Sequence, residues 1–539
     1  MDADTSGTAT KGTRKAGRAI LGSTVVTSAL TVVSRVVGLV REQVRGYYLG
    51  TGMESDAFGI ASTIPNMLRR LFAEGAMTAA FVPVFTSLRT DGDREQLSRF
   101  FSGFMTLFVL LMAGVTMLGV LAAEPLVRHV FAGRFDEVPG KVELTAGLAQ
   151  VMFPYLFLVS VAAIVQATLN SFRIFGPSAF SPVLLSVVNI GAVVLFADRF
   201  ENAAWALAVG FLAGGALQTA FQIPFLRGKG IRFRPTLAGF RDPAVRAVAR
   251  TFLPGVFSAG IYQINVTVSQ VIATSLDPGS VASLQYSLRM QELVLGVFAV
   301  SVATVVLPAM SEQAHEGRIG ELKDTLRFSV GLLGFVTIPA SAGLMLLATP
   351  IIELLFQYGR FDVESTRMTV FALHFHTAGI FFIAMQRNVV QVFYAQKDTK
   401  TPTVIAAVVM VAHVVLCYAL AVPLRQGGIA AAGSIAAALN VALLYVVLRR
   451  RIGGLGTRAL SLSLGRTLAA TAAMAALVGV PVALGAFDGV GRWTLAWRLL
   501  GTIGAGIAVF AVAARLLRSE ELNEFARLVR RRLRRTGSP

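Results

Sequence analysis

The chain has little cysteine and little charge for its length. A single cysteine, Cys417, occurs in 539 residues, so disulfides and cysteine-based metal sites are excluded as organising features. Cys417 lies within an apolar run, where we expect its thiol to act as a small apolar side chain. Charged residues make up 15% of the sequence, whereas soluble globular domains have about a quarter. This composition excludes a soluble globular fold.

Motifs for nucleotide or metal chemistry are also missing from the sequence. It contains no P-loop or other nucleotide motif, so transport driven by ATP is not supported. His374 and His376 look like a metal pair, but residues two positions apart do not share a helix face, and we expect a packed or cavity-facing pair. We therefore predict no enzyme activity, no catalytic residue, no metal and no cofactor.

Apolar residues are abundant instead. The sequence is 55% hydrophobic and its mean hydropathy is +0.66, which indicates an integral membrane protein surrounded by a phospholipid bilayer. The net charge of +19 is carried by short basic clusters between apolar runs. Such clusters indicate membrane topology and not nucleic-acid binding, so we expect no nucleic-acid partner.

Stretches long enough to cross about 30 Å of hydrocarbon recur along the whole chain. They predict an all-α integral membrane protein with about fourteen transmembrane helices. The predicted spans are 23–48, 57–88, 100–123, 145–171, 179–197, 203–226, 248–275, 281–311, 325–348, 367–395, 402–423, 428–449, 461–486 and 493–517.

The basic clusters fall in alternate connections between these spans. By the positive-inside rule, this alternation places both termini in the cytoplasm of a multi-pass protein. We expect residues 1–20 to be an uncleaved basic tail, because no short signal-peptide core with a small-residue cleavage site follows them. For the basic tail 519–539, a short helix on anionic lipid and a solvated topogenic tail both remain open.

An internal repeat is visible in the sequence. The four residues beginning at Gly133, GRFD, recur at Gly359, and the prolines Pro125 and Pro83 recur at shifts of 225 residues. Collinear matches favour a duplication of two parallel halves. The predicted organisation is a basic tail, an N-lobe of helices 1–6, a basic cytoplasmic linker, a C-lobe of helices 7–12, helices 13–14 and a second basic tail: 1–20, 21–227, 228–244, 245–451, 452–518 and 519–539.

Charged residues within the first two predicted spans need a physical reason. One central Arg or Asp costs about 2.5–3.5 kcal/mol to insert, so several together indicate a polar pathway, in which they face water or one another. The residues concerned are Arg35, Arg41, Glu42, Arg45, Asp56, Arg69, Arg70 and Glu74. For Arg41, Glu42 and Arg45 the alternative is that their side chains reach the outer interface.

Pro65 is expected to kink the second span just before these polar residues, and kinked helices at membrane depth usually line cavities. Asn66 and Arg70, and Arg70 and Glu74, have the four-residue spacing of side-chain pairs. In the second half, Arg289 and Glu292 lie within a span, and Arg289 is about one turn from the repeat counterpart of Arg69. Guanidinium groups bind phosphate through two parallel hydrogen bonds, so arginines of both halves are predicted to line one central anion-binding cavity.

Five stretches of the sequence resemble the MurJ (MviN) lipid II flippase family, within the superfamily of multidrug, oligosaccharidyl-lipid and polysaccharide exporters. They are SRVVGLVRE (34–42), DAF (56–58), PNMLRRLFAEGAMTAAFVPV (65–84), LFQYGRF (355–361) and QKDTKTP (396–402). The resemblance covers essentially all predicted spans. Where the family motif has leucine before the proline, this sequence has Ile64.

The resemblance implies transport of undecaprenyl-diphosphate-linked disaccharide pentapeptide from the inner to the outer leaflet of the bacterial cytoplasmic membrane. It implies diphosphate-binding arginines at Arg35, Arg41, Arg69 and Arg289, and the family's neighbouring serine and acidic positions match Ser34 and Glu42. From their positions in the spans we predict further supporting residues: Asp56, Asn66, Arg70, Glu74 and Glu292. The resemblance also implies a lipid-tail groove in helices 13–14 and cell-wall synthesis or division proteins as partners. The energy source is expected to be the membrane potential or a cation gradient.

Two other functions remain open at this stage. A flippase for another polyprenyl-diphosphate glycan would need the same arginines, because they would contact only the diphosphate. A multidrug or organic-cation antiporter of the same architecture would need carboxylates in its cavity, whereas the predicted cavity is rich in arginine and suits an anion.

Overall fold

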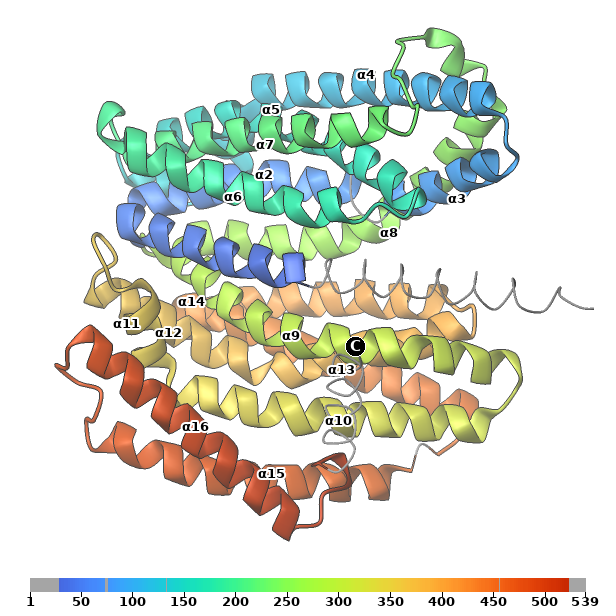
Figure 1. The fold of residues 1–539 in the computed structure, drawn as a ribbon. Helices are drawn as coiled ribbons and strands as arrows, with labels where there is room; N and C mark the ends of the chain where they lie inside the picture. Colours follow the sequence, from blue (N-terminus) through green and yellow to red (C-terminus); the bar gives the residue numbers. More distant parts are fainter. Residues whose placement is uncertain (1–28, 73–75, 132, 455, 523–539) are drawn as a thin grey trace, which may run out of the picture. The chain divides into compact units, whose positions relative to one another are not determined.

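The computed structural model describes residues 29–72, 76–131, 133–454 and 456–522, which divide into two compact units (Figure 1). The first unit takes in the described residues of Met1–Leu49 and Met53–Thr267; the second takes in Gly50–Gly52 and the described residues of Val268–Pro539. Helices make up the regular structure throughout, and no strand occurs among the residues described. The predicted all-α membrane architecture is confirmed.

The first unit is a bundle of long apolar helices. Residues 29–49 are helical, and α5 packs against α2, α4 and α7, while α6 packs against α7 (Figure 1). The helices of this unit are α2 (Met53–Phe72), α3 (Ala76–Thr90), α4 (Arg94–Leu126), α5 (Lys141–Ser171), α6 (Gly176–Phe196), α7 (Ala203–Arg227) and the part of α8 (Pro243–Thr274) up to Thr267.

An aromatic stack forms part of the core of this unit. The Phe81 ring lies 4.8 Å from that of Phe104 and 5.3 Å from that of Phe85, measured between centroids. Asp93 caps the N-terminus of α4, since its carboxylate accepts hydrogen bonds from the backbone N–H groups of Glu95 and Gln96. These local features keep α3 and α4 packed together at one end of the unit.

The segment 228–244, predicted as a basic linker, packs along α4. The backbone N–H of Arg234 donates to Ser102 Oγ at 3.2 Å, and that of Thr236 donates to Thr106 Oγ1 at 3.0 Å. A Cβ built on Gly103 would lie 2.8 Å from the Cα of Gly239, so the two backbones approach too closely for side chains there. The segment is therefore an ordered part of the first unit.

The second unit has helices α9 (Ser280–His315), α10 (Ile319–Leu346), α11 (Ala348–Phe356), α12 (Val363–Ala378), α13 (Ile380–Ala395), α14 (Lys400–Ile452), α15 (Thr457–Ala483) and α16 (Arg492–Leu516), with the end of α8. One predicted span, 367–395, is interrupted, because α12 and α13 meet at a bend of 41°. Helix α14 takes in two predicted spans, 402–423 and 428–449, and it breaks between them at Arg425, where φ is 46° and ψ is −132°. At such breaks, some backbone N–H and C=O groups lack the hydrogen bonds that they would form within a straight helix.

Each predicted span overlaps a helix of the structure, but the number of membrane crossings is a separate matter. Eight described helices are long and apolar enough to cross a membrane, or nine if the bent pair counts as one span. The count of fourteen therefore stays a prediction. The tails at 1–20 and, from residue 523 onward, at the C-terminus lie outside the described residues.

The GRFD repeat has the same local structure in both units. Gly133 and Gly359 both have positive φ, 49° and 57°, and the phenylalanines two positions later, Phe135 and Phe361, are both buried. Each motif is followed by a helix of its own unit, α5 in the first and α12 in the second. This shared conformation supports a duplication, while the lobe boundaries given above stay predictions.

Candidate functional site

A buried charge cluster lies near the end of the helix formed by residues 29–49. Glu42 forms one ion pair with Arg41 at 2.8 Å and a second with Arg45 at 3.6 Å. Glu42 and Arg45 are 7% and 8% exposed. Arg45 also donates from Nη2 to the backbone oxygen of Ser55 at 3.4 Å, at the start of α2. Hence the residues of this cluster are positioned by two helices.

Two aromatic rings complete the surroundings of this cluster. The Arg41 guanidinium lies 5.5 Å from the centroid of Phe211 on α7, and that of Arg45 lies 5.2 Å from the centroid of Phe58 on α2. Rings in this position attract cations through their electron-rich faces.

The cluster has two positive charges and one negative charge. Inserting a charge at membrane depth costs about 2.5–3.5 kcal/mol, and an opposite charge at about 4 Å returns about 4 kcal/mol in a partly buried setting. One carboxylate pairs with both guanidinium groups, and the three side chains together carry one net positive charge. The arrangement of Arg41, Glu42 and Arg45 thus suits a bound anion.

A second polar stretch runs along α2 around Pro65. Asn66 donates from Nδ2 to the Ser62 carbonyl at 2.8 Å, and its Oδ1 accepts from Arg69 Nε at 3.2 Å. Asn66, Arg69 and Arg70 are all half-buried. Eleven residues of helix separate Phe58 from Arg69, so this stretch and the charge cluster lie about 16 Å apart along α2.

The remaining predicted residues are distributed over both units. Arg35 is exposed and Ser34 half-buried, about 9 Å back along the helix from Arg41. On α9 of the second unit, Arg289 pairs with Glu292 at 2.8 Å. The structure thus brings together Arg41 with Glu42, Asn66 with Arg69, and Arg289 with Glu292. Glu74 lies outside the described residues, and a single cavity shared by all the arginines stays a prediction.

Asp56 is fully buried against a lysine that sequence reasoning missed. Its carboxylate lies 2.9 Å from Lys141 Nζ, and that ammonium lies 3.9 Å from the centroid of Phe135 in the GRFD motif. Lys141 begins α5, and it lies outside the predicted span 145–171. Arg45 was named among the charged residues that indicate a polar pathway, but not among the predicted diphosphate-binding and supporting residues.

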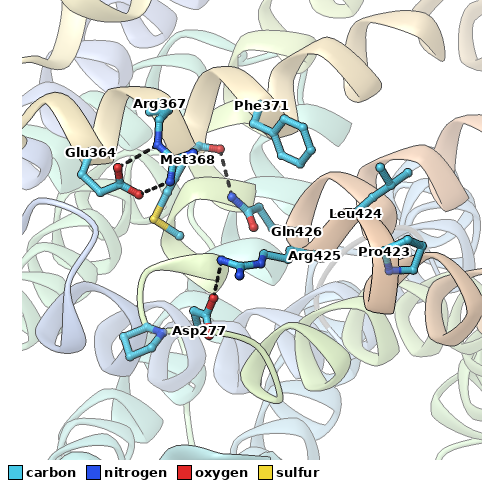
Figure 2. A pocket seen from close by; sticks show the side chains of 10 residues that line it. Asp277, Glu364, Arg367, Met368, Phe371, Pro423, Leu424, Arg425 and Gln426 are labelled. Atoms are coloured by element: carbon cyan, nitrogen blue, oxygen red, sulfur yellow. Dashed lines mark hydrogen bonds and ion pairs between the residues drawn. The ribbon is translucent and has the colours of Figure 1, made fainter.

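The second unit contains a pocket of about 500 Å³ where three segments meet (Figure 2). These segments are the α8–α9 turn, the first turns of α12 and the break in α14. Its lining residues are Asp277, Pro278, Glu364, Arg367, Met368, Phe371, Pro423, Leu424, Arg425 and Gln426. Figure 2 shows the Arg425 side chain reaching Asp277, and Gln426 donating to the Met368 carbonyl, a bond of 3.4 Å.

Arg425 has a strained backbone. Its φ of 46° and ψ of −132° are adopted readily only by glycine, and such strain costs about 1–3 kcal/mol. Its ion pair with Asp277 is 2.7 Å long, but the two side chains are 66% and 50% exposed, and exposed pairs contribute about 0.2–1 kcal/mol. The ion pair alone does not offset the strain.

The described residues contain no group of three His, Cys, Asp or Glu side chains placed to hold a metal ion. His376 Nδ1 lies 2.9 Å from Ser287 Oγ, and His374 Nε2 lies 3.1 Å from the Met345 carbonyl. The two imidazoles therefore contact different helices, as the spacing of their positions requires.

Comparison with known proteins places the chain in a family. The family model "Lipid II flippase MurJ" matches residues 46–485. A probable lipid II flippase MurJ of Vibrio cholerae is 33% identical over 92% of this chain and 96% of its own length, and one of Treponema pallidum is 35% identical over 81% and 83%. A solved structure titled as lipid II flippase MurJ in an inward closed conformation matches with a TM-score of 0.76, at 25% identity, over 91% of this chain and 98% of that one.

A more distant structural match concerns the fold alone. An inward-facing multidrug resistance transporter of the MATE family, MOP superfamily, matches with a TM-score of 0.66 at 16% identity, over 80% of this chain and 99% of that one. The sequence relatives cover nearly the whole molecule, and the family model covers both units described above. The chain therefore belongs to the MurJ family of lipid II flippases.

Proposed function

We propose that this chain moves lipid II, an undecaprenyl-diphosphate-linked disaccharide pentapeptide, from the inner to the outer leaflet of the bacterial cytoplasmic membrane. The family and the names of its members support this substrate. The observation that carries the proposal is the cluster of Arg41, Glu42 and Arg45, whose three side chains carry one net positive charge inside an apolar bundle. A diphosphate is the part of lipid II that such a site would bind.

The arginines determine which cargo fits. A guanidinium donates two parallel hydrogen bonds to phosphate oxygens, and it stays charged at depth where a lysine tends to lose its proton. In our proposal the diphosphate binds, in turn or together, to four arginines: Arg35, Arg41, Arg69 and Arg289. An organic cation would be repelled by the excess positive charge of the cluster, so we do not favour an antiporter for cations.

The lipid tail stays in the bilayer in this mechanism. Moving about 55 carbons through a polar path would expose apolar surface at about 0.8 kcal/mol per CH₂. Only the head group enters the protein. The two halves of the repeat then rock against each other, so that the bound head group is accessible first from one side of the membrane and then from the other, as paired repeats do in other transporters. Helices α15 and α16 are proposed to contact the tail, since both have many exposed apolar side chains.

The driving force is proposed to come from the membrane potential or from a cation gradient. With the cell interior negative, outward movement of an anion is favoured by about 2.3 kcal/mol per net charge per 100 mV. This orientation requires both termini in the cytoplasm, which the positions of the basic clusters support. Flipping that continues unchanged after the potential is collapsed, with the ion gradients intact, would exclude the potential as the driving force.

The direct test is depletion of the protein in its host. We expect lipid II to become inaccessible to a lipid II-cleaving enzyme added outside the cells, and wild-type protein to restore cleavage. Arg69→Lys should restore it poorly although the charge is kept, because lysine lacks the Nε–H that bonds to Asn66. Unchanged external cleavage after full depletion would contradict the proposed function.

A further inference from the structure

The pocket of the second unit is separate from the arginines assigned to the diphosphate. Its walls come from the α8–α9 turn, α12 and the break in α14 (Figure 2). In the proposed orientation, all three segments lie at the outer end of their helices. A pocket of about 500 Å³ is within the range that takes small ligands, and it is large enough for a few amino-acid residues.

Both arginines of the pocket have hydrogen-bond donors to spare. Arg425 pairs with Asp277 through Nη1, and Arg367 pairs with Glu364 through Nε and Nη2. Among the described residues, the Nε and Nη2 of Arg425 and the Nη1 of Arg367 have no protein partner. A carboxylate could accept from the free edge of Arg425 in the two-bond geometry that guanidinium groups favour.

The pocket has acceptors and apolar walls as well. Only one oxygen of the Asp277 carboxylate, Oδ2, pairs with Arg425. The other, Oδ1, has no partner among the described residues, so it is available to an ammonium group. Met368, Phe371 and Leu424 provide apolar surface beside these charges. This combination suits a ligand that has a carboxylate, an ammonium group and small apolar side chains.

The charges of the lining argue against a diphosphate here. Two guanidinium groups are balanced by two carboxylates, Asp277 and Glu364, so the pocket has no excess positive charge. A diphosphate would need such an excess, whereas a zwitterionic peptide would add no net charge to the pocket and could bind the free donors and acceptors while the Arg425–Asp277 pair stays in place. The pocket therefore favours a peptide over the anion bound elsewhere.

The strain at Arg425 gives an independent reason to expect a ligand. Two glycines, Gly427 and Gly428, lie close to the break in α14. The strained backbone conformation itself, however, is at Arg425, a position where glycine would have no strain. Its exposed ion pair does not offset that strain. Residues held in such conformations cluster at ligand clamps and switches, and here the strained residue presents its free guanidinium edge to a pocket.

We propose that this pocket binds the carboxylate-terminated peptide of the lipid-linked substrate at the outer face, with Arg425 as the carboxylate receptor and Asp277 as the ammonium receptor. This proposal rests on the proposed function, because it identifies the peptide as part of the same cargo. It assigns the peptide to the second unit and the diphosphate to arginines elsewhere.

The test uses the full chain in lipid nanodiscs and the soluble pentapeptide of the cell-wall precursor as probe. We expect measurable binding by calorimetry. The affinity should fall at least about tenfold when the C-terminal carboxylate of the peptide is replaced by an amide. Arg425→Gly should lose binding to the same extent while folding normally, since glycine suits this backbone. Arg327→Gln, which removes a similarly partnered arginine of the same unit, should bind like the wild type.

Several outcomes would overturn the proposal. Peptide binding that Arg425→Gly leaves within about twofold would do so, as would pyrophosphate displacing the peptide with the same dependence on Arg425. Wild-type protein that flips lipid II in vesicles but shows no peptide binding would overturn the peptide site and leave the proposed function standing. Failure of flipping with Arg425-dependent peptide binding intact would instead overturn the proposed function and support a peptide site for another cargo.

Discussion

The Lys141 ammonium lies 2.9 Å from the Asp56 carboxylate, with the two side chains only 2% and 1% exposed. Asp56 is on the first turn of α2 and Lys141 begins α5, so the pair joins the start of one helix to the start of the other. Phe135 covers the ammonium from the GRFD turn. This ion pair therefore fixes the helix that holds Asn66 and Arg69 further along.

Removing one partner of this pair should destabilise the first unit strongly. Asp56→Asn leaves a buried ammonium without its counter-charge, and such changes cost about 3–5 kcal/mol. We expect a clear drop in the thermal unfolding temperature in detergent. The double variant Asp56→Asn with Lys141→Met should recover part of the loss, because the buried ammonium that lost its counter-charge is then removed as well.

The matched control is the exposed ion pair of Glu95 and Arg99 on α4, which is 3.0 Å long with both side chains largely exposed. Glu95→Gln should change stability by less than about 1 kcal/mol. If Asp56→Asn and Glu95→Gln lowered the stability equally, the burial of the Asp56–Lys141 pair would have no energetic consequence.

The break in α14 depends on a close backbone approach at Gly428. A Cβ built there would overlap the carbonyl oxygen of Leu420, which is backbone and cannot move aside cheaply. Gly428→Ala should therefore lower stability by at least about 1–3 kcal/mol, the usual cost of overpacking. Gly479→Ala in α15 is the control, since nothing lies within 4 Å of its Cβ position, and it should be neutral or slightly stabilising. Equal unfolding temperatures for the two variants would contradict this explanation of the break.

The fold could be predicted from the sequence because its main signal is long. Apolar runs such as 145–171 dominate the local energetics, and each predicted span overlaps a helix of the structure. The breaks were harder to place. The bend between α12 and α13 lies inside the predicted span 367–395 and was missed, whereas the break in α14 at Arg425 falls in the connection between the predicted spans 402–423 and 428–449.

The candidate site could be predicted only in part. Intramembrane arginines such as Arg41 stand out because their insertion cost demands a reason. Their partners are less visible: Glu42 is adjacent in the sequence, but Phe211 is brought to Arg41 by helix packing. Lys141 was missed because a lysine at a helix start is ordinarily solvated, and only the tertiary structure places Asp56 and Phe135 around it.

Acid should weaken the connection between α13 and α14 through Asp398. Hydrogen bonds from the Thr401 hydroxyl and backbone N–H, together with Arg451, lower the pKa of Asp398 to about 2. A carboxyl group whose folded pKa is depressed stabilises the fold above its unfolded pKa of about 3.9, and that stabilisation is lost as the pH falls toward the folded value. We expect the unfolding temperature to fall between about pH 4 and pH 2.

The Asp398→Asn variant separates this group from other acids. It should be less stable than the wild type at neutral pH, because Arg451 loses its charged partner, and the difference should shrink as the pH falls through this window. The measurement is the unfolding temperature of both proteins in detergent across that range. A difference that stays constant with pH would contradict the role of Asp398.

The charge balance of the buried cluster gives a prediction about transport itself. Glu42→Gln removes the carboxylate that pairs with both Arg41 and Arg45, so the net charge of these three side chains rises from one positive charge to two. A diphosphate should then bind more tightly but leave more slowly, because release requires separating it from a stronger positive field. We expect a pyrophosphate probe to bind about tenfold more tightly and lipid II flipping in vesicles to slow down. Arg99→Gln, which changes an exposed charge on α4, should alter neither quantity. Weaker pyrophosphate binding by Glu42→Gln, in a protein that unfolds at the wild-type temperature, would show that Glu42 orients the arginines for the anion and does not limit their charge.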